Sequence, residues 1–504
     1  METFLTLVLG VVSVLLLHAL LSRRRREGEP PLIKGWIPFL GKTLEFRKDS
    51  HQFLQQLQQR HGDVFTVLIA GKYMTFVMNP LLYPAVIKHG KQLDFHEFTD
   101  SAASRTFGYP AMSSERFPGL SDKIQKLYPY LQGPALNSLT LSMMGNLQLL
   151  LRLRTSQMES PESDWIEEDL YEFCEHLMFE ASFLTLYGKP PQARSPNAHS
   201  QWTTSINTFR EKFRKFDAMF PLLIAHVPIC LLGKTGSIRE ELISFFHPRR
   251  MSEWTNGSEF VQMRSELFQQ YDTLRDRDKA AHHFAILWAS VGNTIPACFW
   301  VLYHLLSDPV ALRAVWKEIV EVIGEKEVEN IHTHDVKLTK EKLDRMIYLE
   351  SAINESLRLS SASMNIRVVQ EDFCLHLDSQ CSVCVRKGDI VVLHPQSTHL
   401  DPDIYTHPKE YQFDRFVEGG KEKTEFYKGN QKVRYYRMPF GSGATMCPGR
   451  FFAINEMKQF VCITLLIYEM QLIDGQPKAM LDTNRAGLGI LPPTNHVSLR
   501  YRPK

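Results

Sequence analysis

One stretch near the C-terminus constrains the chain more than any other: Phe440-Gly-Ser-Gly-Ala-Thr-Met-Cys447-Pro-Gly449. Its glycines let the backbone approach a flat group closely and adopt conformations that other residues avoid. Cys447 stands just before a predicted long helix, whose dipole and free amides favour a thiolate. The simpler interpretation is a buried cysteine in a glycine-rich turn. A phosphate loop is set aside, because a third glycine is missing and no Lys-Ser or Lys-Thr pair follows.

Two further motifs precede this loop. Glu355 and Arg358 are three residues apart, a spacing that places both side chains on one helix face, where they can pair. Alone the pair means little, because most such pairs are surface salt bridges worth about 0–1 kcal/mol. It gains weight from Phe413-Asp-Arg415-Phe416, which lies between the pair and Cys447. A chance match of three motifs in this order is rare.

The three motifs together resemble those of the cytochrome P450 superfamily of haem-thiolate monooxygenases. The resemblance implies a haem whose iron has Cys447 as its axial ligand, with Phe440 and Gly443 as further haem-binding residues. It also implies that Arg415 joins Glu355 and Arg358 in a buried network that braces the haem side. Arg367 resembles the arginine that contacts a haem propionate. Thr445 stands where relatives usually carry a basic residue, so a second propionate contact is not predicted.

The segment Phe284–Pro296 resembles the helix that crosses the distal haem face in this superfamily. Relatives usually carry an acid and a threonine there, whereas this chain has Gly292 and Asn293 at those places, and Thr294 falls one position late. A carboxamide both donates and accepts hydrogen bonds, so Asn293 could hold a water or dioxygen. Asn293 and Thr294 are therefore the predicted catalytic residues. Pro296 should kink the helix, which either opens room near the iron or affects packing alone.

Several flanking segments resemble the sterol 7α-hydroxylase branch: residues 28–36, 288–296, 357–367 and 485–493. Some favour its cholesterol-hydroxylating members and others its oxysterol-hydroxylating members, so the preferred sterol stays open. The resemblance implies 7α-hydroxylation with dioxygen and NADPH electrons delivered by NADPH–cytochrome P450 reductase, in cholesterol catabolism or bile acid synthesis. The candidate residues of the sterol pocket are Trp288, Ala289, Ser360, Ser361 and Asn365. A basic stretch between Lys421 and Arg437 could dock an acidic flavoprotein or could be a solvated loop.

Other functions stay open. Asn293 also permits a haem-thiolate isomerase, which would need neither reductase nor dioxygen. A sterol 12α-hydroxylase of the neighbouring branch is a second alternative, because asparagine at the threonine place is characteristic of both branches. A non-catalytic membrane protein that binds sterol or haem is a third.

The N-terminus carries a predicted membrane anchor. Residues 4–21 hold no charge and would span about 27 Å as a helix, and Arg23–Arg26 follow at once. A cleaved signal peptide would carry its positive charges before the apolar stretch, so a retained anchor is favoured. We predict an anchor over residues 1–22, a basic and proline-rich linker over 23–40 and a catalytic domain over 41–504. The positive-inside rule places the body in the cytosol in a single-pass topology, with membrane lipid as a contact. The family resemblance implies that this membrane is the endoplasmic reticulum membrane.

Composition supports one large folded body. With 44% hydrophobic residues the chain can form a core, and its net charge of +2 argues against nucleic acid as a partner. Eight cysteines in 504 residues are too sparse for a disulfide scaffold, so the seven besides Cys447 are expected to be ordinary thiols, Cys381 and Cys384 included.

We expect a mainly α fold with a smaller β portion: strands at Val64–Ala70, Tyr73–Met78 and around Val383–Val392, and a buried helix over Met457–Met470. The phenylalanines at 209, 213, 216 and 220 predict either a core stripe or a lid helix.

Overall fold

The computed structural model describes residue 10 and residues 23–504, except for residues 38, 113–114, 157–164, 192–195 and 332–333. Apart from Gly10, the predicted anchor over residues 1–22 lies outside the described residues and stays a prediction. The chain divides into two compact units. The first holds the residues up to Phe98, Ser363–Thr406 and Phe426–Thr445, and the second holds Thr99–Ala362, His407–Glu425 and Met446–Lys504.

The first unit is built on a six-stranded sheet with the strand order β1-β2-β3-β9-β6-β4. The strands are β1 (Leu32–Ile33), β2 (Val64–Ile69), β3 (Lys72–Val77), β9 (Ile390–Leu393), β6 (Asn365–Val369) and β4 (Leu93–Asp94). Every residue of β2 is buried, as expected for a strand covered on both faces. Ala70 and Gly71 have positive φ angles in the turn between β2 and β3, which suits the twist of a tight hairpin. The helices of this unit are α2 (Thr43–Lys48), α3 (Ser50–His61), α4 (Tyr83–Ile87) and α19 (Pro395–His399), and a hairpin of β12 (Tyr427–Lys428) and β13 (Gln431–Lys432) completes it.

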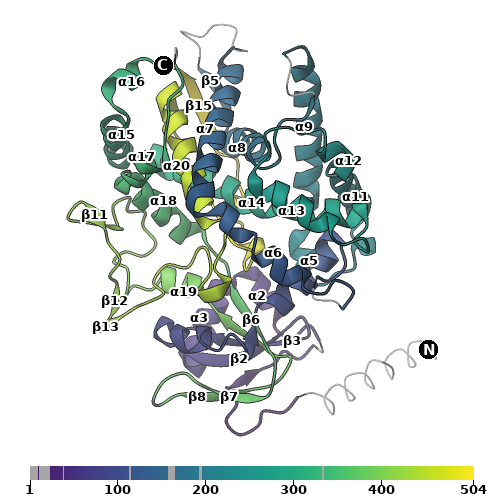
Figure 1. Cartoon of the computed structure of the whole chain (residues 1–504). Coiled ribbons are helices and arrows are strands. Elements are labelled where there is room, and N and C mark those ends of the chain that lie inside the picture. Colours follow the sequence, from purple (N-terminus) through teal and green to yellow (C-terminus); the bar gives the residue numbers. More distant parts are fainter. Residues whose placement is uncertain are drawn as a thin grey trace, which may run out of the picture. The chain divides into compact units, whose positions relative to one another are not determined.

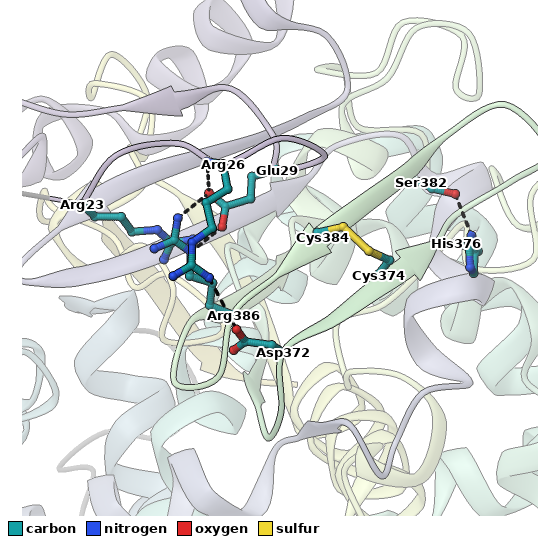
Figure 2. Close-up of a disulfide and its surroundings, with 9 residues drawn as sticks. All are labelled: Arg23, Arg26, Glu29, Asp372, Cys374, His376, Ser382, Cys384 and Arg386. Carbon is teal, nitrogen blue, oxygen red and sulfur yellow. Dashed lines mark hydrogen bonds and ion pairs between the residues drawn. A yellow bond between two sulfur atoms is a disulfide. The ribbon is translucent and has the colours of Figure 1, made fainter.

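A second hairpin in the first unit shows that one expectation about the cysteines was wrong. β7 (Phe373–His376) and β8 (Ser382–Val385) pair antiparallel, which places Cys374 and Cys384 directly opposite one another, and their sulfur atoms form a disulfide (Figure 2). Cys381 is a free thiol. The sequence could not reveal this pairing, because it depends on the register between two strands and not on the spacing of Cys381 and Cys384. The expected strand around Val383–Val392 is likewise two strands, β8 and β9, separated by a turn at Gly388, whose φ is 82°.

The segment after the predicted anchor lies against this hairpin (Figure 2). The backbone N–H of Cys384 donates to the Gly28 carbonyl at 2.8 Å, and Arg386 Nη2 donates to Glu29 Oε2 at 2.8 Å. Arg23 pairs with Glu29 at 3.4 Å, and its side chain is only 11% exposed. Part of the arginine cluster that follows the predicted anchor is therefore engaged within the first unit.

Helices dominate the second unit. They include most of α5 (His96–Phe107), then α6 (Leu120–Gln125), α7 (Gly133–Ser156), α8 (Leu170–Tyr187), α9 (Pro196–Asp217), α10 (Phe220–Ile224), α11 (Thr235–Phe245), α12 (Pro248–Met251), α13 (Glu259–Gln269), α14 (Asp276–Ser307), α15 (Pro309–Ile323), α16 (Glu325–Glu329), α17 (Lys340–Asp344), α18 (Ile347–Ser360) and α20 (Arg450–Ile467). The strands of this unit are β5 (Ile166–Asp169), β14 (Tyr468–Leu472) and β15 (Ser498–Pro503), which form a sheet in the order β14-β15-β5, and the short pair β10 (Val417–Glu418) and β11 (Lys421–Glu422). This content confirms the predicted mainly α fold with a smaller β portion.

The core of the second unit lies around α14. This helix packs against α8, α18 and α20, and α7 packs against α8 and α20, as Figure 1 shows for α7 and α20. The predicted helix over Met457–Met470 is shorter at its C-terminal end, because α20 ends at Ile467 and β14 begins at Tyr468. Among the described residues, α14 is the one helix that is long and apolar enough to cross a membrane, but most of it is buried inside the protein.

The phenylalanine stripe belongs to this core. Phe209, Phe213 and Phe216 lie on α9 and Phe220 begins α10, and all four side chains are buried. The ring of Phe209 lies 4.7 Å from that of Phe245, and the ring of Phe216 lies 5.3 Å from that of Phe284 on α14. The core interpretation of the stripe is confirmed.

Candidate functional site

Cys447 lies three residues before α20, and its side chain is open to solvent although many protein atoms surround it. Burial raises the pKa of its thiol, while hydrogen bonds from the backbone N–H groups of Gly449 and Arg450 and the charge of Arg450 oppose this rise. A metal ion bound to this sulfur would favour the thiolate form. An accessible sulfur with amide donors directed at it fits the thiolate ligand of a haem iron.

The three residues of the predicted brace form one buried network in the second unit. Arg358 donates two hydrogen bonds to the Glu355 carboxylate, from Nε and Nη2, each at 2.7 Å. Arg415 Nε donates to the same carboxylate at 2.8 Å. Glu355 and Arg358 are fully buried, so this carboxylate balances two guanidinium groups in a region of low dielectric. Backbone carbonyls accept further hydrogen bonds from these guanidinium groups. For example, Arg358 Nη1 donates to the Pro408 carbonyl at 2.7 Å.

Arg367 lies on β6 in the first unit and is buried. Burial lowers the pKa of its guanidinium, against the opposing charge of Asp94. Its Nη2 donates to the Thr445 hydroxyl at 2.7 Å and its Nη1 to the Ile366 carbonyl at 2.8 Å. A buried guanidinium that donates only to neutral oxygens is suited to donate to an anionic oxygen such as that of a carboxylate.

The loop before Cys447 is fixed to the same strand. The Ser442 hydroxyl donates to Asn365 Oδ1 at 3.0 Å, so Asn365, a pocket candidate from sequence, holds this loop. Gly443 has a φ of 62°, and a Cβ there would lie 2.6 Å from Ile87 Cγ2, so the position requires glycine. Phe440 is partly buried.

The middle of α14 carries an accessible face although the helix is central. Ala289 is exposed, and Gly292 and Asn293 are partly exposed, whereas Leu287, Val291 and the turn after Thr294 are buried. Ala289, Gly292 and Asn293 stand at i, i+3 and i+4, so they share one face of the helix, which neighbouring side chains leave partly uncovered. This is the segment that the sequence assigned to the distal side of the haem.

Asn293 is tied to the C-terminal loop, which comprises residues 485–491. Its Oδ1 accepts a hydrogen bond from the Ile490 backbone N–H at 2.9 Å. Gly489 has a φ of 114°, and a Cβ at this position would lie 2.1 Å from Asn293 Oδ1, so the contact requires glycine here. Asn293 therefore orients the loop with its carbonyl oxygen, while its amide nitrogen can still donate.

The model of the cytochrome P450 family matches residues 30–499. The chain belongs to the cytochrome P450 family. Mouse "Cytochrome P450 7B1" is 41% identical to it over 498 residues, covering 98% of this chain and 95% of the relative. Chinese hamster "Cholesterol 7-alpha-monooxygenase" is 40% identical over 488 residues, with coverage of 96% and 95%. Rabbit "7-alpha-hydroxycholest-4-en-3-one 12-alpha-hydroxylase" is 38% identical over 514 residues, with coverage of 99% and 98%.

In this cytochrome P450, Thr294 faces away from Asn293's partners. Its hydroxyl donates to Glu456 Oε1 on α20 at 3.0 Å, and the Ser182 hydroxyl donates to Glu456 Oε2 at 3.2 Å. Burial raises the pKa of Glu456 to about 8, although both hydroxyl groups act against the rise. The Thr294 side chain therefore lies on the side of α14 that packs against α20. The catalytic role predicted for it stays a prediction.

The remaining pocket candidates of the cytochrome P450 lie near the C-terminal loop. Trp288 is half-buried, and its indole N–H donates to Asp217 Oδ1 at 2.8 Å. Ser360 and Ser361 are buried, and the Ser360 carbonyl accepts from the Leu491 N–H at 2.9 Å, while Ser361 forms a β-bridge with Ile490. The two serines therefore support the loop through their backbones.

Sequence reasoning missed Asp217, Gly489 and Glu456. Glu456 could have been noticed as a carboxylate at the edge of an apolar helix. Asp217 stands at the end of an ordinary amphipathic helix and gives no signal in the sequence.

Proposed function

We propose that this cytochrome P450 is a membrane-bound sterol monooxygenase that hydroxylates carbon 7 of cholesterol or of an oxysterol on the α face. The observation that carries the proposal is the similarity over nearly the whole chain to a cholesterol 7-alpha-monooxygenase. The accessible face of α14, formed by small residues, supports it further, because a flat and mainly apolar sterol can approach such a surface closely.

Haem bound through Cys447 supplies the activation of dioxygen. The chain's own residues hold and shape the site: the Glu355 network braces the ligand side, and Arg367 is proposed to neutralise one propionate. Asn293 is proposed to place a hydrogen-bonding amide beside the reacting oxygen while its carbonyl oxygen holds the Ile490 N–H. Electrons are proposed to come from NADPH through cytochrome P450 reductase, which would dock at the basic stretch between Lys421 and Arg437.

The test uses the full-length protein with haem, NADPH and cytochrome P450 reductase, and offers cholesterol, 25-hydroxycholesterol and 27-hydroxycholesterol side by side. Mass spectrometry and comparison with standards then identify the product. We expect a 7α-hydroxylated sterol that needs both NADPH and reductase. Cys447→Ala should abolish it, whereas Cys230→Ala, which changes an exposed free cysteine, should not.

Other products would contradict the proposal. Hydroxylation at carbon 12 would assign the chain to the activity named for its rabbit relative. Turnover of a prostaglandin endoperoxide without NADPH would indicate an isomerase. Tight sterol-induced spectral shifts without any product would indicate a binding protein.

A further inference from the structure

A polar cluster joins three separate elements of the second unit. Asp217 is the last residue of α9, Trp288 lies in the middle of α14, and Arg485 begins the C-terminal loop. Asp217 Oδ1 accepts from the Trp288 indole N–H at 2.8 Å, and Asp217 Oδ2 pairs with Arg485 Nη2 at 2.9 Å. Arg485 Nη1 also donates to the backbone carbonyl of Asp217 at 3.0 Å.

Helix stability does not explain Asp217. A carboxylate at the C-terminal end of a long helix meets the negative end of the helix dipole, which is unfavourable. The rings around its partner Trp288 are apolar as well: the ring of Phe107 lies 5.8 Å from Trp288, 6.2 Å from Phe216 and 6.5 Å from Phe220. Arg485 offsets both problems at once, because it neutralises the carboxylate and donates to the last helical carbonyl. The side chains of Asp217 and Arg485 are 23% and 14% exposed, so solvent screens this pair only weakly.

The cluster fixes the orientation of Trp288. The indole is held at its N–H by Asp217, and Phe220 stacks on its face with the ring centroids 4.0 Å apart and the planes 17° apart. A Cβ at Gly292 would lie 3.6 Å from the indole, an ordinary van der Waals contact, so the ring lies directly beside the next turn of α14. Trp288 directly precedes Ala289, the most accessible residue of the open face of α14. Its ring is therefore a rigid wall beside that face.

The cluster also fixes the C-terminal loop over the same helix. Arg485 holds the start of the loop to α9, Asn293 holds Ile490, and the Trp300 indole donates to the Leu491 carbonyl at 2.6 Å. Removing the Asp217 carboxylate would release Arg485 at the start of the loop and the Trp288 indole together, while the attachments of the loop at Ile490 and Leu491 would remain.

We propose that Asp217 is a positioning residue that sets the regioselectivity of oxidation, by holding Trp288 and the C-terminal loop as fixed walls of the sterol site. This role rests on the proposed sterol oxidation. Asp217 touches neither haem nor substrate in this assignment and acts through Trp288 and Arg485. A sterol that lies between fixed walls presents one carbon, whereas mobile walls admit several poses.

The test compares Asp217→Asn with the wild type as full-length haem protein with reductase and NADPH. The asparagine keeps an acceptor for the Trp288 N–H but loses the charge that holds Arg485. We expect the share of sterol product oxidised away from the wild-type position to rise at least threefold, and the sterol dissociation constant, read from the haem absorbance shift, to rise about fivefold. Glu469→Gln breaks a surface pair with Arg502 in the same unit and is the matched control that should change neither.

A purely structural role would lower the melting temperature and the turnover rate but leave the product distribution as in the wild type, and that result would overturn the proposal. If Asp217→Asn fails to take up haem, Arg485→Gln replaces it, because it removes the positive charge that pairs with Asp217 and leaves the Trp288 ring unchanged. If the wild type forms no sterol product, the proposed function fails, and the sterol dissociation constant then tests the role of Asp217 by itself. Equal affinity of variant and wild type for the sterol would overturn that role, and an affinity weakened about fivefold would support it.

Discussion

The buried Glu456 gives a prediction whose magnitude follows from the structure. Glu456 lies between α14 and α20 with Thr294 and Ser182 as its hydrogen-bond donors, and burial raises its pKa from the ordinary 4.5 to about 8. Between these two pH values the unfolded chain has lost the proton while the folded chain keeps it. The protonated Glu456 carboxyl therefore contributes fully to the free energy of unfolding below about pH 4.5, and this contribution is lost as the pH rises to about 8.

The perturbation is Glu456→Gln, which keeps an acceptor for Thr294 but cannot ionise. The pKa difference of about 3.5, at about 1.4 kcal/mol per pH unit, sets an upper limit of ~5 kcal/mol on the stability that the wild type loses across this range. An unfolding entropy of about 2 cal/mol/K per residue converts this into ~5 °C of melting temperature for a chain of 504 residues.

The assay is thermal unfolding of the full-length haem protein, followed by circular dichroism from pH 5 to pH 8.5. Groups shared by wild type and variant cancel in the difference of melting temperatures. We expect Glu456→Gln to be close to the wild type at pH 5 and to become relatively more stable by up to ~5 °C at pH 8.5. Glu418→Gln, whose side chain is 72% exposed, is the control and should give a constant offset. A difference that stays flat for Glu456→Gln, or that falls as the pH rises, would refute the reasoning.

Three further predictions concern the other assemblies described above. Glu355→Gln leaves two buried guanidinium groups without their counter-charge, so we expect the free energy of unfolding to fall by about 3–5 kcal/mol. The haem content, measured by the reduced-CO absorbance, should also be much smaller, and normal haem uptake would contradict the bracing role. Asn293→Ala should uncouple oxygen consumption from product while the reduced-CO absorbance stays intact, and unchanged coupling would rule out its proposed part in handling oxygen. Cys374→Ser removes the disulfide to Cys384, which closes a short loop with a separation of 10 residues. We therefore expect the free energy of unfolding to fall by about 3 kcal/mol. A reducing agent should lower the melting temperature of the wild type and not that of this variant, and equal responses would show that the disulfide does not stabilise the fold.

Much of the candidate site could be found from the sequence because its chemistry is local. Cys447 is recognisable because glycines and a helix start stand next to it in the chain. Glu355 and Arg358 are recognisable because helix geometry alone places residues three apart on one face. Arg415 could be placed only through family resemblance, yet the structure brings it to the same carboxylate at 2.8 Å.

Other features depend on which distant segments meet. The sequence predicted that Cys374 and Cys384 are ordinary thiols, but the strand register places them opposite one another and they form a disulfide. The contact between the Thr294 hydroxyl and Glu456 is of the same kind, because α14 and α20 are far apart in the chain and meet only in the folded core.

The sequence by itself determined the mainly α fold, the cytochrome P450 family and the cysteine proposed as the iron ligand, because short motifs and helical periodicity are local properties of the chain. The tertiary structure alone decided the contacts of Asp217, whose partners lie 71 and 268 residues away along the chain. Hydrogen bonds and ion pairs act over about 3 Å, so they depend on how helices and loops pack, and no spacing in the sequence encodes that distance.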